Sequence, residues 1–135
     1  MITGQCDCGG VHFTIAQMRE TVTYCHCSQC RKMSGHVLAL TRAQSKDITF
    51  QSDDTLRWYR SSDEARRGFC GACGSTLFFQ PIGADHYGIA AGCLEAPTGL
   101  TPGKHIFIDS KGDYYPLPTD AVLFDGYDTP HHQGD

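Results

Sequence analysis

Apolar and polar residues alternate over short stretches of the chain, and this pattern predicts a mainly β protein. Residues 11–15, Val-His-Phe-Thr-Ile, place an apolar side chain at every second position, which is typical of a strand with one buried face. Stretches rich in β-branched and aromatic residues predict further strands at 21–27, 37–41, 48–50, 56–60, 76–80, 86–92 and 105–108. Apolar residues never recur at helical spacing over three turns, so little helix is expected beyond one turn at 28–34, ended by Gly35.

The length and composition fit one small globular domain. The chain has 135 residues, of which 40% are apolar and 19% are charged, and it can bury a core of moderate size. No linker divides it, so residues 1–128 are predicted to form a single domain. The apolar spacing weakens after Lys111 and prolines become frequent, so residues 129–135 are predicted to form a flexible C-terminal tail.

Charge and hydropathy narrow the classes of partner. The formal net charge is −4, so the chain has no basic excess to neutralise phosphates, and nucleic acid is not expected as a partner. No apolar run approaches the ~20 residues that cross a bilayer, so no membrane association is expected. Residues 1–6 lack the basic and apolar segments of a signal peptide, and a cytoplasmic location is predicted.

The eight cysteines are grouped in a way that favours metal binding. Seven of them fall in three short motifs: C-x-C at Cys6 and Cys8, C-x-C-x-x-C at Cys25, Cys27 and Cys30, and C-x-x-C at Cys70 and Cys73. Only Cys93 stands alone. In a reducing compartment such motifs indicate metal binding or catalysis, whereas the alternative reading is the disulfide framework of a secreted protein.

The two outer motifs together supply the four ligands of a closed metal site. Zinc prefers four ligands in a tetrahedron, and two short cysteine pairs far apart in sequence are the usual way to provide them. Glycines beside Cys6, Cys8, Cys70 and Cys73 permit the sharp turns that let the sulfurs converge. Metal binding at such a site contributes on the order of 10 kcal/mol to folding. Four thiolates suit zinc, and they also suit iron.

The middle motif predicts a site of a different kind. In extended backbone, residues two apart point the same way, so Cys25 and Cys27 can share one ion while His26 faces away, which favours a structural role for that histidine. Cys30 then closes the turn, and the fourth ligand position stays open, as in catalytic sites. Zinc with three thiolates carries a net charge of −1, so it activates water poorly but can still bind an incoming thiol as a thiolate.

Other readings of this motif stay open. Cys93 or a histidine could supply a fourth ligand and make the site structural. The three cysteines could hold metal in only part of the molecules, or they could form a redox-active thiol pair with one spare cysteine.

These motifs resemble those of the glutathione-dependent formaldehyde-activating enzyme (GFA) family, which also includes centromere protein V. The matching blocks occur in the family's order and span residues 4–115: Gly4-x-Cys6-x-Cys8-Gly9-x-Val11-x-Phe13, Cys25-His26-Cys27-x-x-Cys30-Arg31-Lys32-x-Ser34-Gly35, Phe69-Cys70-x-x-Cys73-Gly74-Ser75-x-Leu77, and His105-Ile106-Phe107 with Lys111. The chain departs from the family in having Tyr114 and Tyr115 where tryptophan is frequent. It is also shorter than the best-known members that use glutathione.

The resemblance implies a small zinc-stabilised, tent-like β fold related to that of methionine-R-sulfoxide reductases. It implies two zinc ions per chain. One is structural, on Cys6, Cys8, Cys70 and Cys73, and the other is catalytic, on Cys25, Cys27 and Cys30. It also implies a carbon–sulfur lyase activity that adds formaldehyde to glutathione, reversibly, to give S-hydroxymethylglutathione.

Three residues after the middle motif are candidates for contact with the substrate. Arg31 and Lys32 could pair with a carboxylate of glutathione, or could be solvated surface charges. Ser34 could hydrogen-bond a ligand or a metal-bound sulfur, or could cap the helical turn.

We therefore predict an enzyme that forms or cleaves a small thiol–aldehyde adduct, with glutathione as its co-substrate. The alternatives are a non-enzymatic, zinc-stabilised binding module and a thiol reductase based on Cys93. The sequence is compatible with a homodimer but does not fix the oligomeric state.

Overall fold

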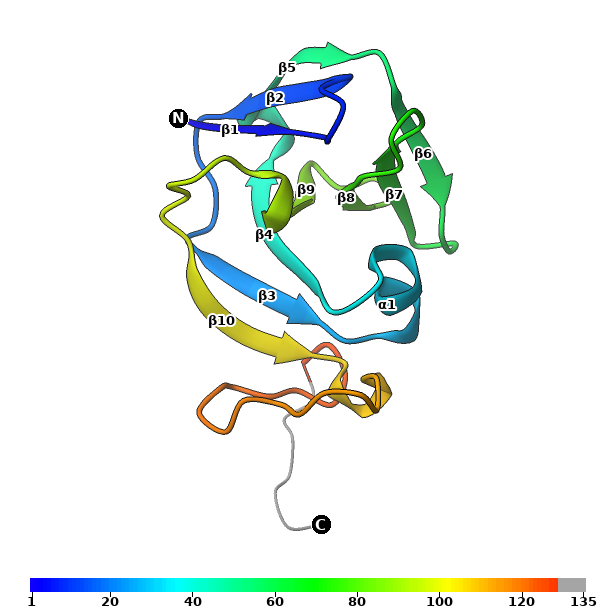
Figure 1. Ribbon diagram of the computed structural model, residues 1–135, viewed down its shortest axis with the longest axis vertical. Helices are drawn as coiled ribbons and strands as arrows, with labels where there is room; N and C mark the ends of the chain where they lie inside the picture. Colours follow the sequence, from blue (N-terminus) through cyan, green and yellow to red (C-terminus); the bar gives the residue numbers. More distant parts are fainter. Residues whose placement is uncertain (129–135) are drawn as a thin grey trace. The chain divides into compact units, whose positions relative to one another are not determined.

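The computed structural model describes residues 1–128 and divides the chain into two compact units. The first unit consists of residues 1–20 and 41–100, and the second unit comprises residues 21–40 and 101–128. Both are built mainly from strands, and α1 (Ser28–Ser34) is the one α-helix among the described residues (Figure 1). The mainly β class predicted from the alternating pattern is therefore confirmed.

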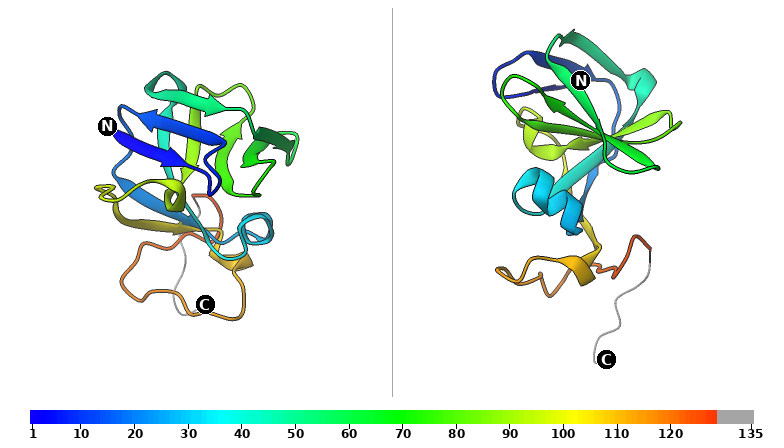
Figure 2. Two further views of the ribbon diagram at one scale, coloured as in Figure 1. Left: turned by 45° about the horizontal axis from the view of Figure 1, so that its top comes forward. Right: turned by 90° about the vertical axis from the view of Figure 1, so that its right-hand side faces the viewer.

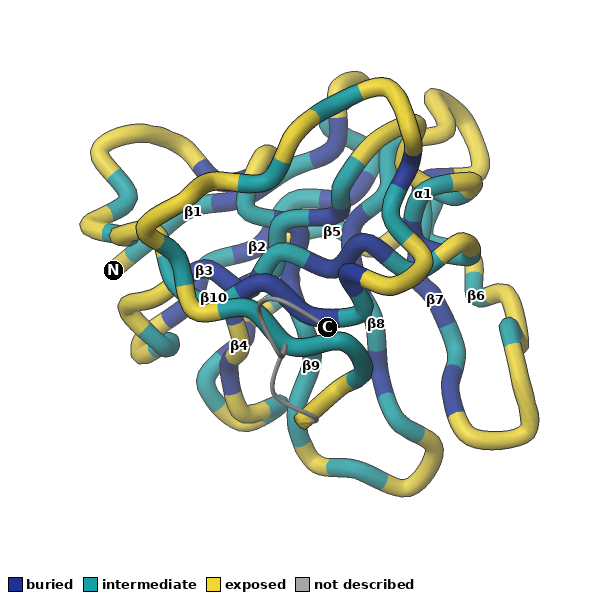
Figure 3. Tube along the Cα trace, turned by 90° about the horizontal axis from the view of Figure 1, so that it is seen from below, coloured by how far each residue is buried: buried dark blue, intermediate teal, exposed yellow. Residues whose placement is uncertain are grey.

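A three-stranded antiparallel sheet begins the first unit. Its strands are β1 (Ile2–Gln5), β2 (Val11–Ile15) and β5 (Ile48–Asp53), in the order β1-β2-β5 (Figure 2). The apolar residues of β2 are at most 1% exposed, whereas the polar residues between them are half-buried. Figure 3 shows the same alternation along the chain trace. This sheet brings the two ends of the turn between β1 and β2 together, which matters for the first cysteine pair.

Four further antiparallel strands belong wholly to the first unit. They are β6 (Leu56–Arg60), β7 (Ala65–Cys70), β8 (Thr76–Pro81) and β9 (His86–Ala90), neighbours in the order β9-β8-β7-β6. The turn between β7 and β8 carries the C-x-x-C motif. Short 3-10 helices cover Ser45–Asp47 and Ala91–Cys93 in this unit and Ile108–Ser110 in the second.

An aromatic core holds the first unit together. The ring centroids of Phe13 and Phe78 are 5.1 Å apart, and Phe50, Trp58 and Tyr87 pack around Phe78. Phe13 and Phe78 are almost fully buried, and burial of such a side chain contributes about 1.5–3 kcal/mol. The core also contains Cys6 and Cys70, so the four-cysteine site is anchored in the buried core of this unit.

The second unit is built on a parallel strand pair. The strands β10 (Thr101–Ile106) and β3 (Thr21–Cys25) are parallel, and the first residues of β4 (Leu38–Gln44) pair with β3 in antiparallel register. The segment around Leu123 lies along β10, because the His105 N–H donates to the Val122 carbonyl and the Phe124 N–H donates to the His105 carbonyl. The central strand β3 therefore delivers Cys25 to the start of the loop that leads into α1.

The strand boundaries differ from the sequence prediction in places. The strand β1 was not predicted, because its four residues carry one strongly apolar side chain. The last strand was predicted at 105–108 but ends at Ile106 and begins at Thr101, since backbone pairing extends it into a polar stretch. The helical turn at 28–34 is confirmed. The predicted tail lies outside the described residues, and the single domain stays a prediction.

Among residues 1–128, no helix has the length and apolar character that crossing a membrane requires.

Candidate metal centres

The first cysteine pair lies on the turn between β1 and β2. The Cys6 N–H donates to the Val11 carbonyl, and the Gly9 N–H donates back to the Cys6 carbonyl, which closes a tight loop. Gly9 has a φ of 79°, a left-handed conformation that glycine adopts without strain. The turn therefore brings the Cys6 and Cys8 sulfurs within 3.6 Å of each other.

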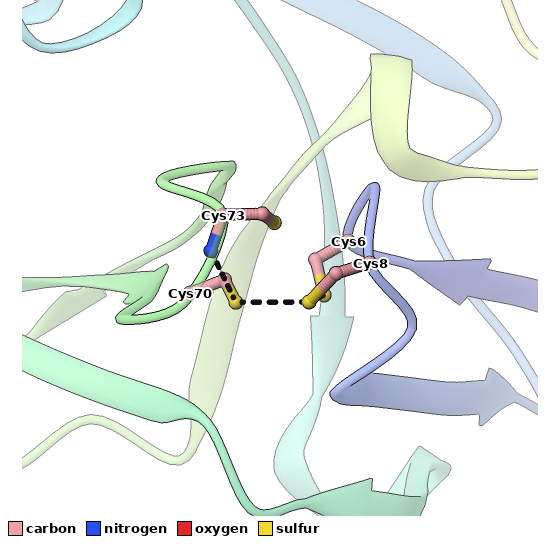
Figure 4. A group of neighbouring side chains, drawn as sticks. All are labelled: Cys6, Cys8, Cys70 and Cys73. Carbon is pink, nitrogen blue, oxygen red and sulfur yellow. Dashed lines mark hydrogen bonds between the residues drawn. The ribbon is translucent and has the colours of Figure 1, made fainter.

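The second pair lies on the turn between β7 and β8. The Gly74 N–H donates to the Cys70 carbonyl, and Gly74 has a φ of 80°. The Cys8 and Cys70 sulfurs are 3.6 Å apart, so the two turns meet. All four sulfurs lie within 4.8 Å of one another (Figure 4). We call Cys6, Cys8, Cys70 and Cys73 the four-cysteine cluster.

Hydrogen bonds to the sulfurs of this cluster favour the ionised form of its thiols. The Val11 N–H donates to the Cys6 sulfur, and the Cys73 N–H donates to the Cys70 sulfur, at 3.2 and 3.3 Å. The Thr55 hydroxyl, 3.1 Å from the Cys70 sulfur, is the main reason that the pKa of Cys70 falls to about 5. The Ser75 hydroxyl is likewise the main reason that the pKa of Cys73 is lowered.

The fourth thiol shows why a cation belongs at this cluster. The Gly10 backbone N–H lowers the pKa of Cys8, but the neighbouring sulfurs of Cys70 and Cys6 outweigh it and raise that pKa to about 12. Four thiolates therefore cannot coexist at neutral pH unless a positive ion neutralises them. Four converging sulfurs that are contacted by backbone N–H donors and by hydroxyls fit a closed metal site of the zinc type.

The second group of cysteines comes from the junction of β3 and α1. Cys25 ends β3, Cys27 is the N-cap of α1, and Cys30 lies in the first turn of that helix. The Cys30 N–H donates to the Cys27 sulfur at 3.2 Å, and the Cys30 thiol donates to the Cys25 sulfur at 3.1 Å. We call these residues the three-cysteine cluster.

The three-cysteine cluster also fits a cation. The sulfurs of Cys27 and Cys30, together with burial, raise the pKa of Cys25, so a metal ion would relieve the cost of ionising these thiols. Among the described residues, no further cysteine, histidine or carboxylate belongs to this metal-binding group. Within residues 1–128, neither Cys93 nor a histidine joins the three sulfurs, and a group of three ligands is the arrangement of an open site. None of the eight cysteines, which all lie in the described part, forms a disulfide.

Comparison with known proteins identifies the family of this chain. The sequence matches the family described as glutathione-dependent formaldehyde-activating enzyme over residues 1–110. The chain belongs to the GFA family. It is 28% identical over 123 residues to a protein of Schizosaccharomyces pombe (strain 972 / ATCC 24843) named "Uncharacterized lyase C29B12.13", covering 90% of this chain and 88% of that protein. It is also similar to the crystal structure of a Rhodobacter sphaeroides protein, structural genomics target RhR83, with 25% identity and a TM-score of 0.59 over 74% of this chain and 97% of that one.

In this GFA-family chain, the residue between two of the clustered cysteines is buried in a hydrogen-bond network. The His26 side chain is 2% exposed, and its two ring nitrogens lie 2.6 Å from the Tyr115 hydroxyl and 2.8 Å from Nδ1 of His105. Burial is the main cause that lowers the pKa of His26 to about 4, and the charges of His105, His36 and Lys111 act in the same direction. The imidazole is therefore neutral at physiological pH.

The predicted substrate contacts differ in their surroundings. The Arg31 Nε is buried without a hydrogen-bond partner among the described residues, and Lys32 is exposed. The Ser34 hydroxyl lies 2.7 Å from the Cys30 carbonyl and 2.9 Å from the His36 carbonyl, so it closes the end of its own helix. Arg31 therefore has an unused hydrogen-bond donor for a ligand, whereas the Ser34 hydroxyl is already hydrogen-bonded within the protein.

Cys93 belongs to neither cysteine cluster. It lines a cleft of about 500 Å³ in the first unit, between residues 5–7, 75–76 and 92–95. Its thiol donates to the Ala90 carbonyl at 3.0 Å, and burial raises its pKa to about 12. A thiol that keeps its proton at neutral pH is a poor nucleophile, which argues against a reductase based on this residue.

Sequence reasoning did not assign roles to Thr55, His105 or Tyr115. Thr55 carries no local signal, because it reaches Cys70 only through the packing of the turn after β5. His105 lies in one of the family's sequence blocks, and Tyr115 stands where the family often has tryptophan. Both contact His26, but His105 is 79 positions and Tyr115 is 89 positions away from it in the sequence, so no local pattern predicts these contacts.

Proposed function

We propose that this member of the GFA family is a carbon–sulfur lyase that forms or cleaves a thiol–aldehyde adduct such as S-hydroxymethylglutathione. The observation that carries the proposal is the contrast between the two clusters. One offers four sulfurs and is complete, whereas the other offers three and has no fourth ligand from the described residues. The family assignment and the lyase name of the yeast relative support the same reaction class.

Two zinc ions per chain would serve these clusters. The four-cysteine cluster would hold a structural ion, and the three-cysteine cluster would hold a catalytic one. A zinc ion at the second position supplies a Lewis acid that binds the sulfur of a thiol and keeps it deprotonated at neutral pH.

The chain's own residues prepare the three-cysteine cluster for this chemistry. Cys25 and Cys30 are 5% and 4% exposed, so the sulfurs sit in surroundings that exclude most water. The N–H of Cys30 fixes the Cys27 sulfur at the start of α1. The protein thus holds three soft donors in place before any ligand arrives.

Positive side chains next to this cluster favour an anionic thiol. Arg31 and Lys32 lie on α1, directly after Cys30, and glutathione carries two carboxylates that such groups can pair with. The buried, unpartnered Nε of Arg31 gains a hydrogen bond when a carboxylate binds there. Ser34 would support the site indirectly by closing the helix. Cysteines grouped for metal binding fit a cytoplasmic protein. The oligomeric state stays open, and a homodimer is compatible with the sequence.

The proposal is tested by the rate of adduct exchange. Zinc-loaded protein is added to glutathione and formaldehyde, and the interconversion with S-hydroxymethylglutathione is followed by exchange NMR against the uncatalysed background. We expect the wild type and Cys93→Ser to accelerate exchange and Cys27→Ser to leave only the background rate. Equal acceleration by Cys27→Ser would refute the proposal. Absence of acceleration by the loaded wild type would favour a binding module instead.

A further inference from the structure

Two members of the three-cysteine cluster form a C-x-x-C motif, and their side chains differ in accessibility. Cys27 is half-buried, whereas Cys30 is only 4% exposed. C-x-x-C is the spacing of many redox-active cysteine pairs, because residues three apart at the start of a helix are neighbours on one face. All three sulfurs of the cluster lie within 4.8 Å of one another. A small oxidant from solvent therefore meets Cys27 first, with the Cys30 sulfur nearby.

Hydrogen bonds hold the sulfurs of this cluster together. The Cys30 N–H donates to the Cys27 sulfur at 3.2 Å, which keeps that sulfur over the first turn of α1. The Cys30 thiol donates to the Cys25 sulfur at 3.1 Å, the shortest of the sulfur–sulfur contacts given above. Cys30 thus contacts both other cysteines. A disulfide needs its sulfurs about 2 Å apart, so a rotation of the Cys27 and Cys30 side chains has to close the remaining gap.

The number of ligands sets this cluster apart from the four-cysteine cluster. Exposure alone would direct an oxidant to Cys8 and Cys73, which are both exposed. The four-cysteine cluster, however, offers zinc a complete set of sulfurs, and two of these belong to the buried core. A sulfur held by an ion has to be released before it can bond to another sulfur. The three-cysteine cluster offers one sulfur fewer, so its sulfurs are released more readily.

We propose that Cys27 and Cys30 form a peroxide-sensitive switch, in which hydrogen peroxide joins their sulfurs in a disulfide and glutathione opens it again. The inference rests on the proposed function, because it assigns a regulation to the cluster that would carry the lyase activity. The thiol that this enzyme uses as co-substrate would also be the reductant that restores it.

The atoms and electrons of the oxidation balance. The Cys27 sulfur attacks one oxygen of hydrogen peroxide, the O–O bond breaks, and the leaving hydroxide takes the thiol proton, which gives a sulfenic acid on Cys27 and one water. The Cys30 sulfur then attacks the Cys27 sulfur. The S–O bond breaks, the S–S bond forms, and the hydroxide leaves with the Cys30 proton as a second water. Two thiols thus lose two electrons and two protons, and the peroxide is reduced.

The reverse reaction needs two molecules of glutathione. The first attacks one sulfur of the disulfide and forms a mixed disulfide, and the second displaces the protein thiol from it. The products are the two protein thiols and glutathione disulfide. Between these events the cluster keeps one thiol, that of Cys25, which is 5% exposed. A single sulfur does not make a zinc site, so the oxidised cluster should lose its metal and its thiol binding.

The test maps the disulfide in the zinc-loaded, full-length protein. The protein is treated with hydrogen peroxide, zinc release is followed with a coloured chelator, and the remaining free thiols are blocked with iodoacetamide. Cleavage after Arg19 and Arg31 then gives one peptide, residues 20–31, which carries these three cysteines and no other. We expect a Cys27–Cys30 disulfide with blocked Cys25, and release of one of the two zinc ions expected. Added glutathione and zinc should restore both thiols and the metal content.

Two variants separate the roles of the thiols. Cys30→Ser removes the resolving thiol, so a sulfenic acid should accumulate on Cys27, where dimedone traps it. Cys93→Ser is the matched control, because Cys93 belongs to neither cluster, and it should form the disulfide and release zinc as the wild type does. A disulfide that forms in Cys30→Ser as fast as in the wild type would overturn the assignment of Cys30.

The outcomes also distinguish this inference from the proposed function. If the loaded wild type accelerates adduct exchange but peroxide leaves Cys27 and Cys30 as thiols, the switch is refuted and the lyase stands. A disulfide confined to the four-cysteine cluster would refute the switch as well. If the wild type does not accelerate exchange, the lyase proposal fails and with it the regulatory role, whereas the peptide mass still decides whether the disulfide forms.

Discussion

The hydroxyl of Thr55 should set the metal affinity of the four-cysteine cluster at neutral pH. Thr55 follows β5, and its hydroxyl lies 3.1 Å from the Cys70 sulfur. It is the foremost cause of the shift of the Cys70 pKa from 9.0 to about 5. At pH 7 a thiol with a pKa of about 5 is already ionised, so metal binding does not have to expel its proton. Thr55→Val keeps the shape of the side chain and removes this hydroxyl.

The size of the effect follows from the pKa. If the pKa of Cys70 returned fully to its ordinary value, only about 1% of the thiol would be ionised at pH 7, and apparent zinc affinity would fall about 100-fold. Backbone N–H groups of Cys73 and Ala72 also lower that pKa, so we expect a loss of about 10- to 100-fold, as for other groups that hydrogen-bond a metal ligand. More protons should be released on zinc binding.

The assay is competition with a zinc chelator in a Cys27→Ser background, with calorimetry in buffers of different ionisation enthalpy to count released protons. Thr14→Val is the control, because the Thr14 hydroxyl accepts from the Gln51 side-chain amide at the surface and no cysteine is involved. Unchanged zinc affinity and proton release in Thr55→Val would refute the reasoning.

Two further predictions concern stability. A Cβ at Gly103 would lie 2.4 Å from the Val22 carbonyl oxygen, so Gly103→Ala should lower the free energy of unfolding by about 1–3 kcal/mol, measured by denaturant unfolding. A Cβ at Gly92 meets open space, so Gly92→Ala is the control and should leave the free energy of unfolding unchanged. Equal stability of the two variants would contradict this prediction. The pKa of His26 is about 4 when folded and 6.5 when unfolded, so between these values the unfolded chain binds more protons and stability falls as pH falls. His26→Gln should have a shallower dependence of the melting temperature on pH over this window, and an equally steep one would rule the explanation out.

The local features of this chain were readable from its sequence. Alternation identified β2, the glycine-flanked cysteine pairs indicated a four-sulfur site, and the spacing of Cys25, Cys27 and Cys30 indicated a separate one. These patterns are short-range, because strand periodicity and tight turns depend on neighbouring residues.

Features that depend on long-range pairing were not readable. β10 pairs in parallel with β3, and the segment after Lys111 turns back along β10, so His105 and Tyr115 meet His26 only in the folded chain. The interpretation of His26 as a structural residue followed from its direction away from the sulfurs. That interpretation did not consider which residues contact the His26 ring on the side away from the sulfurs.

The central claim is that the three-cysteine cluster holds a metal that accepts a thiol, and metal analysis combined with calorimetry tests it most directly. Zinc per chain is measured in the wild type and in Cys27→Ser, and glutathione is titrated into each fully loaded protein. The account predicts two zinc ions per wild-type chain and thiol binding that disappears in Cys27→Ser. Two zinc ions per chain with no thiol binding would contradict it.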